Sequence, residues 1–324
     1  MTDTKIIAVI GATGATAGGL ARAILDDPAG GFACRAITRR PESPAARALA
    51  ERGAEVVVAD LDDEASLVRA FEGVYGAFCM TSFFEHFSAE QEALQAAHLA
   101  HASAAAGVQH AVWSTAKDTR RWYPLDDDRM PTLQGRFKVP PWDGKAEGDA
   151  AFASAGVPTT YLLTPFHWEA FTLGQGAPRR GEDGTLALTI PLSDAKLPGI
   201  AAEDIGRCAY AIFQAGERLI GATVGIASEH LTGAELAAGL SVILGEPVRY
   251  QHVPADVLRS FPAPGAELAG NMFQFVAEQN DAFCSARDPR TARSLNPRLV
   301  SFADWVADTP RSLAQPASAS TSSR

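Results

Sequence analysis

The chain has 324 residues, of which 47% are hydrophobic and 20% are charged, so it is long enough for one large or two modest globular domains. Its 28 basic and 38 acidic side chains give a formal net charge of −10. Because an acidic surface repels phosphate backbones, this charge argues against a direct nucleic-acid partner.

The interrupted apolar segments and the spacing of the cysteines are typical of a cytoplasmic protein. Glycines and charges interrupt every apolar run, so no membrane-spanning segment is expected. The single Lys5 and the glycine cluster that follows argue against a secretory signal. No cysteine pair has C-x-x-C or zinc spacing, and all four are interpreted as reduced core residues: Cys34, Cys79, Cys208 and Cys284.

Strand and helix signals alternate over the first half of the chain. Residues 6–10 predict a short parallel strand, and a helix follows up to residue 25. Further strands are predicted at residues 34–38, 54–61, 76–81, 110–116 and 159–165. Further helices are predicted at 43–53, 63–73, 88–107 and 143–156, and the first three are predicted to be capped by Ser43, Asp63 and Ser88. This order predicts an α/β fold with a Rossmann-type, doubly wound parallel sheet, whose ligands bind beyond the carboxyl ends of the strands.

The regular alternation of predicted strands and helices ends after about residue 166. Strands are predicted at residues 184–192, 222–228 and 248–254, and helices at 201–213 and 232–245. We therefore predict three parts: a Rossmann dinucleotide-binding domain over residues 1–165, a smaller mixed α/β lobe over 166–312 that forms a cleft, and a disordered tail over 313–324.

The segment from residue 11 to residue 19 reads GATGATAGG and lies between the first strand and the first helix. That context is typical of a dinucleotide fingerprint, here Gly11-x-x-Gly14-x-x-Ala17. Gly11 would permit the tight turn, Gly14 the close approach of a pyrophosphate, and Ala17 the packing of the helix on the sheet. The alternative is a turn that needs glycines for its conformation only.

Arg39 and Arg40 follow the second strand, where a cofactor with a free 2′-hydroxyl usually meets an acidic residue. A guanidinium there suits a 2′-phosphate, so NADP(H) is favoured over NAD(H). A solvated arginine pair is the alternative. Asp60, at the end of the third strand, is placed either to face adenine or as an ordinary loop aspartate.

The Tyr-x-x-x-Lys pair of short-chain reductases is absent. None of the five tyrosines has a lysine four residues later: Tyr75, Tyr123, Tyr161, Tyr210 and Tyr250. Lys145 lies on the helix after the fifth strand, but Pro141 stands four residues before it. Lys145 could hold the nicotinamide ribose or donate a proton itself, and the alternative is a solvated helix lysine. Ser114 and Thr115 could assist with a hydroxyl.

Aromatic residues gather after three predicted strands. They suit either an apolar pocket for a flat ligand or packing between lobes: Phe83, Phe84, Phe87, Trp122, Tyr123, Trp142, Phe166, His167, Trp168 and Phe171. His98 and His101 share a helix face, but no third ligand follows a known metal pattern, so we predict no metal site.

Taken together, these segments resemble the NmrA-like family, a branch of the atypical short-chain dehydrogenases. The resemblance runs to about residue 310 and is strongest to NADPH-sensing members. It rests on GATGATAGG, AITRRP, GAEVVVADLDD, TSFFEHFSAEQE, WDGKAE, GVPTTYLLTPFHWEAF and NMFQF.

The resemblance implies NADP(H) in the cleft and a set of contacts. The 2′-phosphate would contact Arg39. Ser43 stands where the NADPH-sensing relative has a lysine near that phosphate, and Arg40 would compensate for the missing lysine. Ala17 replaces the usual third glycine, and Ala170 stands where the sensor has an asparagine. The remaining implied contacts are Gly11, Ala12, Thr13, Gly14, Ala15 and Thr16 to the pyrophosphate, Asp60 and Leu61 to adenine, Ser82, Phe83 and Phe84 along the dinucleotide, Lys145 to the nicotinamide ribose, and His167, Trp168 and Glu169 near the nicotinamide.

Two functions remain open at this point. Some family members bind the dinucleotide and report redox state to a regulatory protein partner, and others transfer hydride. The absent tyrosine favours a redox sensor or regulator. The alternative is an NADPH-dependent oxidoreductase of a quinone, enone or isoflavone-like aromatic molecule, with Lys145 or a water as proton donor. The Ala-rich helix at residues 88–106 could pair two subunits in a homodimer.

Overall fold

The computed structural model describes residues 4–172, 176–181 and 183–310. The chain divides into two compact units. Unit 1 contains residues 4–164, 202–226 and 294–297, and unit 2 contains the other described residues. The predicted domain boundaries at residues 165 and 312 stay predictions, and the predicted tail at 313–324 lies outside the described residues.

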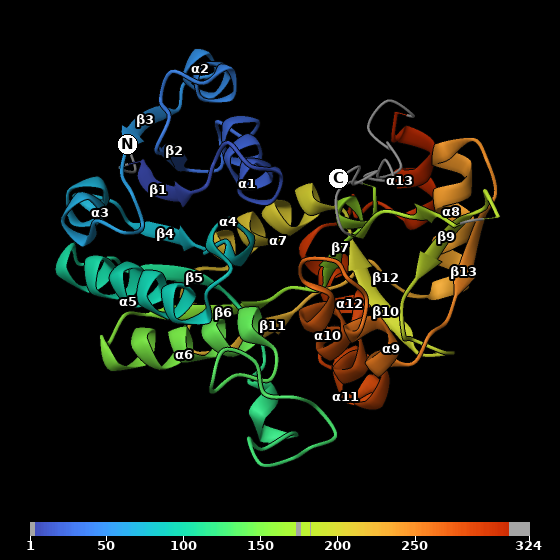
Figure 1. Ribbon diagram of the computed structural model, residues 1–324. Coiled ribbons are helices and arrows are strands. Elements are labelled where there is room, and N and C mark those ends of the chain that lie inside the picture. The colour runs from blue at the N-terminus through green and yellow to red at the C-terminus, as the bar shows by residue number, and fades with distance from the viewer. Residues whose placement is uncertain (1–3, 173–175, 182, 311–324) are drawn as a thin grey trace. The chain divides into compact units, whose positions relative to one another are not determined.

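Unit 1 is built on a seven-stranded sheet with the order β11-β6-β5-β4-β1-β2-β3 (Figure 1). Every neighbouring pair is parallel, which confirms the doubly wound sheet. The strand order reverses between β1 and β4, and ligands of such sheets bind at this switch point. The strands are β1 (Lys5–Ile10), β2 (Phe32–Thr38), β3 (Glu55–Val58), β4 (Gly76–Cys79), β5 (His110–Thr115), β6 (Thr159–Leu163) and β11 (Thr223–Gly225).

Helices flank this sheet. Helix α5 packs against both α3 and α6, while α1 packs against α7, and Figure 1 shows α5 and α6 side by side. Three predicted caps are confirmed, because the side chains of Ser43, Asp63 and Ser88 each accept a backbone N–H three residues later. The helices are α1 (Ala15–Leu25), α2 (Pro44–Glu51), α3 (Glu64–Phe71), α4 (Phe83–His86), α5 (Ala89–Ala105), α6 (Pro140–Ser154) and α7 (Ala202–Ala215), with 3₁₀ turns at Thr119–Arg121 and Gly216–Leu219.

The core of unit 1 includes Trp113 of β5, which stacks on Phe152 of α6 with ring centroids 5.2 Å apart. All six residues of β5 are buried, as expected for a parallel strand covered on both faces. Cys34, Cys79 and Cys208 are buried and free, and burial raises the pKa of each thiol to about 12. These three cysteines are therefore unreactive core residues.

Unit 2 holds two small mixed sheets. In one, β10 (Lys196–Ile200) pairs antiparallel with β12 (Glu229–Thr232) and parallel with β7 (Phe166–His167). In the other, β9 (Leu186–Thr189) pairs parallel with β13 (Val248–Gln251) and antiparallel with β8 (Arg179–Arg180). The remaining helices are α8 (Gly233–Leu244), α9 (Ala255–Arg259), α10 (Ala266–Glu278), α11 (Asn280–Ser285), α12 (Pro289–Leu295) and α13 (Phe302–Asp308), with a 3₁₀ turn at Trp168–Phe171.

Helix α7 and strand β11 follow the first segment of unit 2 in the sequence but lie in unit 1. Strand β11 pairs with β6 as the seventh strand of the large sheet. Within the described residues, no helix combines the length and apolarity that crossing a bilayer requires.

Candidate functional site

The glycine loop joins β1 to α1 at the carboxyl edge of the sheet. Gly11 has φ +71°, a conformation that favours glycine, and its carbonyl accepts the Gly14 N–H at 2.8 Å. Gly14 caps α1 in an extended conformation, with no side-chain cap and no acidic residue in the first turn. The free N–H groups and the positive end of the helix dipole therefore suit an anion.

A side chain on Gly14 would narrow this turn, because its Cβ would lie 3.3 Å from the Gly11 carbonyl oxygen. Ala12 is 1% exposed, so it lies within the packing beneath the turn and its contact with a ligand stays a prediction. Thr13 and Ala15 are exposed and Thr16 is half-buried. The first half of the segment thus forms a cradle that fits a pyrophosphate.

The second half of the segment serves packing between helices. A Cβ on Gly19 would lie 2.4 Å from the carbonyl oxygen of Glu203 in α7. In the other direction, a Cβ on Gly206 would lie 2.6 Å from the Thr16 carbonyl oxygen. Sequence reasoning did not find this role, since the partner helix is nearly two hundred residues away.

A pocket of about 300 Å³ lies at the carboxyl ends of β2 and β3 and the start of α3. Arg39 lines it, and its Nη2 lies 2.5 Å from Oε2 of Glu85 on α4, with both side chains 55% exposed. Asp60 also lines the pocket, and its Oδ1 accepts the Asp62 N–H at 3.1 Å. The other lining residues are Val58, Ala59, Asp63, Ser66 and Arg69.

The remaining predicted adenosine contacts lie close by. Arg40 is exposed, and its backbone N–H donates to the Thr38 hydroxyl at 3.1 Å. The Leu61 carbonyl accepts from Nδ1 of His98 at 2.7 Å. His101 lies 3.3 Å from Glu64, so both predicted helix-face histidines have protein partners. The described part of the chain holds no group of three side chains suited to a metal ion.

The segment after β4 lies beside the glycine loop, since a Cβ on Gly11 would lie 3.9 Å from Sδ of Met80. Ser82 begins α4 without a side-chain cap. Phe83 is 3% exposed, whereas Phe84 is 61% exposed. Phe83 is therefore part of the packing beneath this edge, and Phe84 is free to meet a ligand.

Lys145 of α6 is not a solvated helix lysine. Its side chain is 17% exposed, and Nζ lies 3.0 Å from Oε1 of Glu92. Nζ also donates to the hydroxyl of Thr81 at 2.7 Å and to its carbonyl at 3.2 Å, and it lies 5.2 Å from the Trp113 ring centroid. These contacts hold the ammonium next to the switch point, where β4 adjoins β1.

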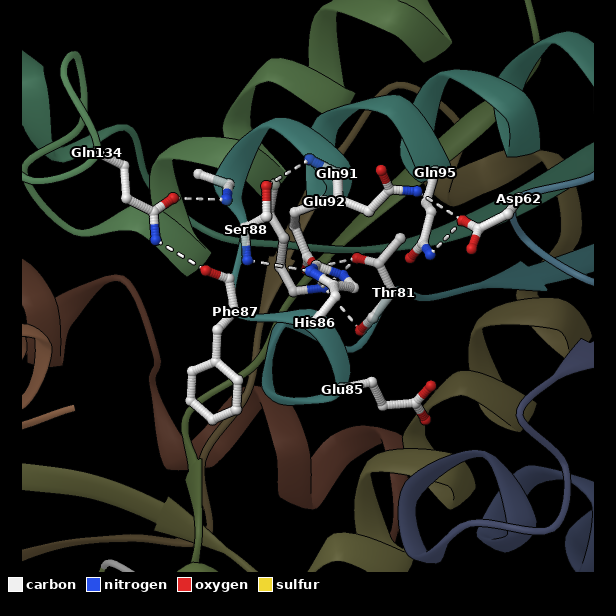
Figure 2. A network of polar contacts seen from close by, with 12 residues as sticks. Asp62, Thr81, Glu85, His86, Phe87, Ser88, Gln91, Glu92, Gln95 and Gln134 are labelled. Carbon is white, nitrogen blue, oxygen red and sulfur yellow. Dashed lines mark hydrogen bonds and ion pairs between the residues drawn. The ribbon is translucent and has the colours of Figure 1, made fainter. Parts of the chain in front are cut away.

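The partner of Lys145 is a carboxylate that sequence reasoning missed. The Glu92 side chain on α5 is 0% exposed and accepts from the Thr81 hydroxyl at 2.6 Å. Its Oε2 lies 3.4 Å from Nε2 of His86. Figure 2 shows Thr81, His86 and Glu92 gathered at one point. In an Ala-rich helix a glutamate usually lies on the solvent-exposed face, so nothing in the sequence predicts that Glu92 is buried.

A second carboxylate lies one turn further along α6. Oδ1 of Asp149 accepts from the Thr115 hydroxyl at 2.5 Å and from Nε1 of Trp113 at 2.9 Å. Burial raises the pKa of Asp149 to about 6. The hydroxyl of Thr115 is thus engaged at the end of β5, as a support for α6.

Two buried charges organise the long connection between β5 and α6. The Lys138 ammonium donates to the carbonyls of Met130, Asp127 and Leu125 at 2.6, 2.9 and 3.4 Å. The Asp143 carboxylate accepts four hydrogen bonds, from backbone N–H groups of Thr119, Lys138 and Val139 and from the Thr119 hydroxyl. Burial raises the pKa of Asp143. This connection is a fixed part of the structure despite its length.

The predicted residues near the nicotinamide belong to unit 2. Trp168 is 1% exposed and packs against Phe302 and Trp305, with ring centroids 5.1 and 5.6 Å away. Glu169 accepts from Nε1 of Trp305 at 3.2 Å, while His167 is exposed. Trp168 is therefore a core residue of unit 2, and the contact of His167 and Glu169 with a ligand stays a prediction.

The family model and the curated relatives that match this chain carry the same family name. The model of the NmrA-like family matches residues 3–306. The NmrA-like family domain-containing oxidoreductase FrzB of Cladobotryum sp. is 30% identical over 261 residues, which cover 77% of this chain and 76% of that protein. The oxidoreductase hkm9 of Aspergillus hancockii, which carries the same family name, is 28% identical over 290 residues, covering 83% and 82%.

Solved structures share the fold. NmrA, a negative transcriptional regulator in complex with NADP, has a TM-score of 0.74 at 23% identity and covers 94% of this chain and 95% of its own. The NADPH-dependent quinone oxidoreductase QOR2 of Escherichia coli, complexed with NADPH, has a TM-score of 0.70 at 24% identity, covering 93% and 98%. Triphenylmethane reductase of Citrobacter sp., complexed with NADP(H), has a TM-score of 0.71 at 19% identity, covering 94% and 99%.

Proposed function

Because the chain belongs to the NmrA-like family, we propose that it is an NADP(H)-dependent oxidoreductase that acts on a small aromatic or quinone-like molecule. The observation that carries the proposal is the placement of Lys145, whose ammonium is held by a buried carboxylate at the switch point of the sheet. The names of the curated relatives, which are oxidoreductases, support the same class.

The residues present fit a dinucleotide with a 2′-phosphate. The uncapped start of α1 and the narrow turn at Gly14 would hold the pyrophosphate. Arg39 would hold the 2′-phosphate in place of its ion pair with Glu85. When bound, the cofactor supplies hydride. Lys145 would hydrogen-bond the nicotinamide ribose, and its Nζ–H or a water would protonate the reduced product.

A second candidate, a redox sensor that binds NADP(H) without turnover, is favoured by one observation. The position four residues before Lys145 is Pro141, which has no acidic proton. Such a sensor needs a large difference in affinity between NADPH and NADP⁺, since a ligand shifts a conformation only by its differential binding. The partner of such a sensor would be a regulatory protein. We also propose that two copies of the chain pair through α5.

A cytoplasmic location is part of the proposal. It is supported by the four free thiols, Cys34, Cys79, Cys208 and Cys284, which suit a reducing compartment.

Turnover separates the two candidates. The purified protein is mixed with NADPH and a panel of quinones, enones and imines, and absorbance at the reduced nicotinamide band is followed. We expect steady oxidation at catalytic enzyme concentrations, and a loss of about tenfold or more in kcat/KM for Lys145→Met. Tight NADPH binding without turnover over the whole panel would contradict the enzyme and support the sensor, provided that NADP⁺ binds much more weakly.

The preference for NADP(H) has its own test. Arg39→Ala should weaken NADPH binding by about tenfold and leave NADH binding nearly unchanged, because only NADPH carries the 2′-phosphate. Arg52→Ala serves as the matched control, because it removes an exposed arginine that is also paired with a carboxylate but follows the end of α2. Calorimetric titration of both dinucleotides measures the effect. An equal loss for the two cofactors would show that Arg39 does not read the 2′-phosphate.

A further inference from the structure

Glu92 is a carboxylate without access to solvent, and it is held by side chains of three other segments. Thr81 follows β4, His86 ends α4 and Lys145 lies on α6, whereas Glu92 itself belongs to α5. Full burial of a carboxylate is unfavourable by several kcal/mol unless donors compensate it. An apolar side chain would pack at this position without that penalty, so the glutamate indicates a specific requirement for its charge.

The two carboxylate oxygens of Glu92 face different side chains. Oε1 receives the Thr81 hydroxyl at 2.6 Å and lies 3.0 Å from Nζ of Lys145. The same Nζ donates to the Thr81 hydroxyl oxygen at 2.7 Å. Lys145, Thr81 and Glu92 therefore form a closed triangle of contacts, which leaves the ammonium little freedom to turn.

The ring of His86, which faces the second oxygen, is oriented by the backbone. The Ser88 N–H donates to Nδ1 of His86 at 3.1 Å, so Nδ1 is the acceptor nitrogen and the proton of a neutral ring is on Nε2. That Nε2 lies 3.4 Å from Oε2 of Glu92, and both residues are labelled in Figure 2. Neither atom has a hydrogen-bond partner within the described residues, so their approach to 3.4 Å is the polar contact that the structure gives them.

We propose that Glu92 is a positioning residue, which with His86 and Thr81 fixes the ammonium of Lys145 so that it meets the nicotinamide-ribose part of the dinucleotide. Glu92 acts through Lys145 and touches no ligand itself. The inference rests on the proposed function for the identity of that ligand. The fixation of Lys145 is a property of the protein alone and can be measured without it.

The first test uses Glu92→Gln, which keeps the size of the side chain. Glutamine still offers Oε1 to Thr81 and Lys145, but its amide N–H groups face Nε2–H of His86 and the negative charge is lost. We expect NADPH affinity to fall by about tenfold. Affinity for adenosine 2′,5′-bisphosphate, which lacks the nicotinamide ribose, should stay within about twofold of wild type.

Glu90→Gln is the matched control, because it is the same change at an exposed position of the same helix, and it should leave both affinities unchanged. An equal loss for the two ligands would indicate a general structural role and overturn the proposal. No loss for either ligand would also overturn it.

A double-variant comparison tests whether Glu92 acts through Lys145. If it does, Glu92→Gln adds nothing to the loss of NADPH affinity that Lys145→Met causes alone. Independent losses that multiply in the double variant would contradict this. His86→Ala, at a partly exposed position, is the milder variant if Glu92→Gln does not fold, and it should change NADPH affinity in the same direction by about threefold.

The ligand-free test is an acetylation footprint read by mass spectrometry. Lys145 of the wild type should react slowly with acetic anhydride compared with the exposed Lys117, and Glu92→Gln should accelerate Lys145 severalfold while Lys117 stays constant. An unchanged rate at Lys145 would overturn the fixation. Absence of NADPH binding in a wild type that passes this footprint would instead count against the proposed function.

Discussion

Two parts of unit 1 meet at the carboxyl edge of the sheet and are built in different ways. In the glycine loop, Gly11 and Gly14 are required by the turn they form themselves. In the cluster around Lys145, the side chains come from four segments, and Lys145 and Thr81 are 64 residues apart. A turn that needs glycines leaves a recognisable spacing in the sequence. Side chains that the fold brings together from distant segments leave no such spacing.

The largest effect is expected at Gly19, where the glycine segment packs against the distant helix α7. Gly19→Ala would place a Cβ 2.4 Å from the Glu203 carbonyl of α7, and backbone atoms cannot move aside cheaply. We expect the free energy of unfolding to fall by about 3 kcal/mol or more, measured by urea denaturation. Ala15→Gly, at the exposed start of the same helix, should lower it by about 1 kcal/mol or less. Equal stabilities for the two variants would contradict the contact between α1 and α7.

A smaller effect is expected beside the cluster, at Asp149. Burial raises the pKa of this carboxyl to about 6, so the folded state binds its proton more tightly than the unfolded chain, whose aspartates titrate near about 4. The free energy of unfolding therefore falls as the pH rises from about 4 to about 6 and stays lowered above that.

Asp149→Asn removes this charge and keeps Oδ1 as the acceptor for Trp113 and Thr115. The variant should be more stable than wild type by on the order of 1–2 kcal/mol at about pH 7 and equal to it below about pH 4. Denaturation curves across this range measure the difference, with the exposed Asp128→Asn as control. A constant difference at every pH would rule out the titration of Asp149 as its cause.

The smallest effect links the two parts. Glu85 lies on α4 next to His86 and pairs with Arg39, so on the proposed function it would compete with the 2′-phosphate for the guanidinium. Glu85→Gln should strengthen NADPH binding by about threefold at low ionic strength, and less in high salt, because the pair is exposed and screened. NADH binding is the internal control. Weaker NADPH binding in this variant would show that Glu85 supports the site instead of competing for it.

The same contrast explains how far the sequence predicts the molecule. The first six strands and the caps at Ser43, Asp63 and Ser88 follow from local patterns and are confirmed. Strand β11 and helix α7 lie within residues 166–312, so chain order alone predicts them in the smaller lobe. Pairing of β11 with β6 and packing of α7 on α1 override that order.

For the site, the sequence predicts the glycine loop and singles out Lys145, but it leaves open whether that lysine is solvated. Only the fold answers this, since the burial of Lys145 depends on Glu92 and Thr81 from distant segments. Glu92 itself has the spacing of an ordinary helix glutamate. Its role follows from where α5 packs against α6.

The connection between β5 and α6 has a consequence for changes of chain length. The ammonium of Lys138 is bound by carbonyls of Leu125, Asp127 and Met130, so the chain supplies both the cation and the ring of oxygens that holds it. An insertion or deletion inside residues 125–130 would turn at least one oxygen away and leave a buried charge short of acceptors. A loop graft at this place therefore has to replace Lys138 in the same step.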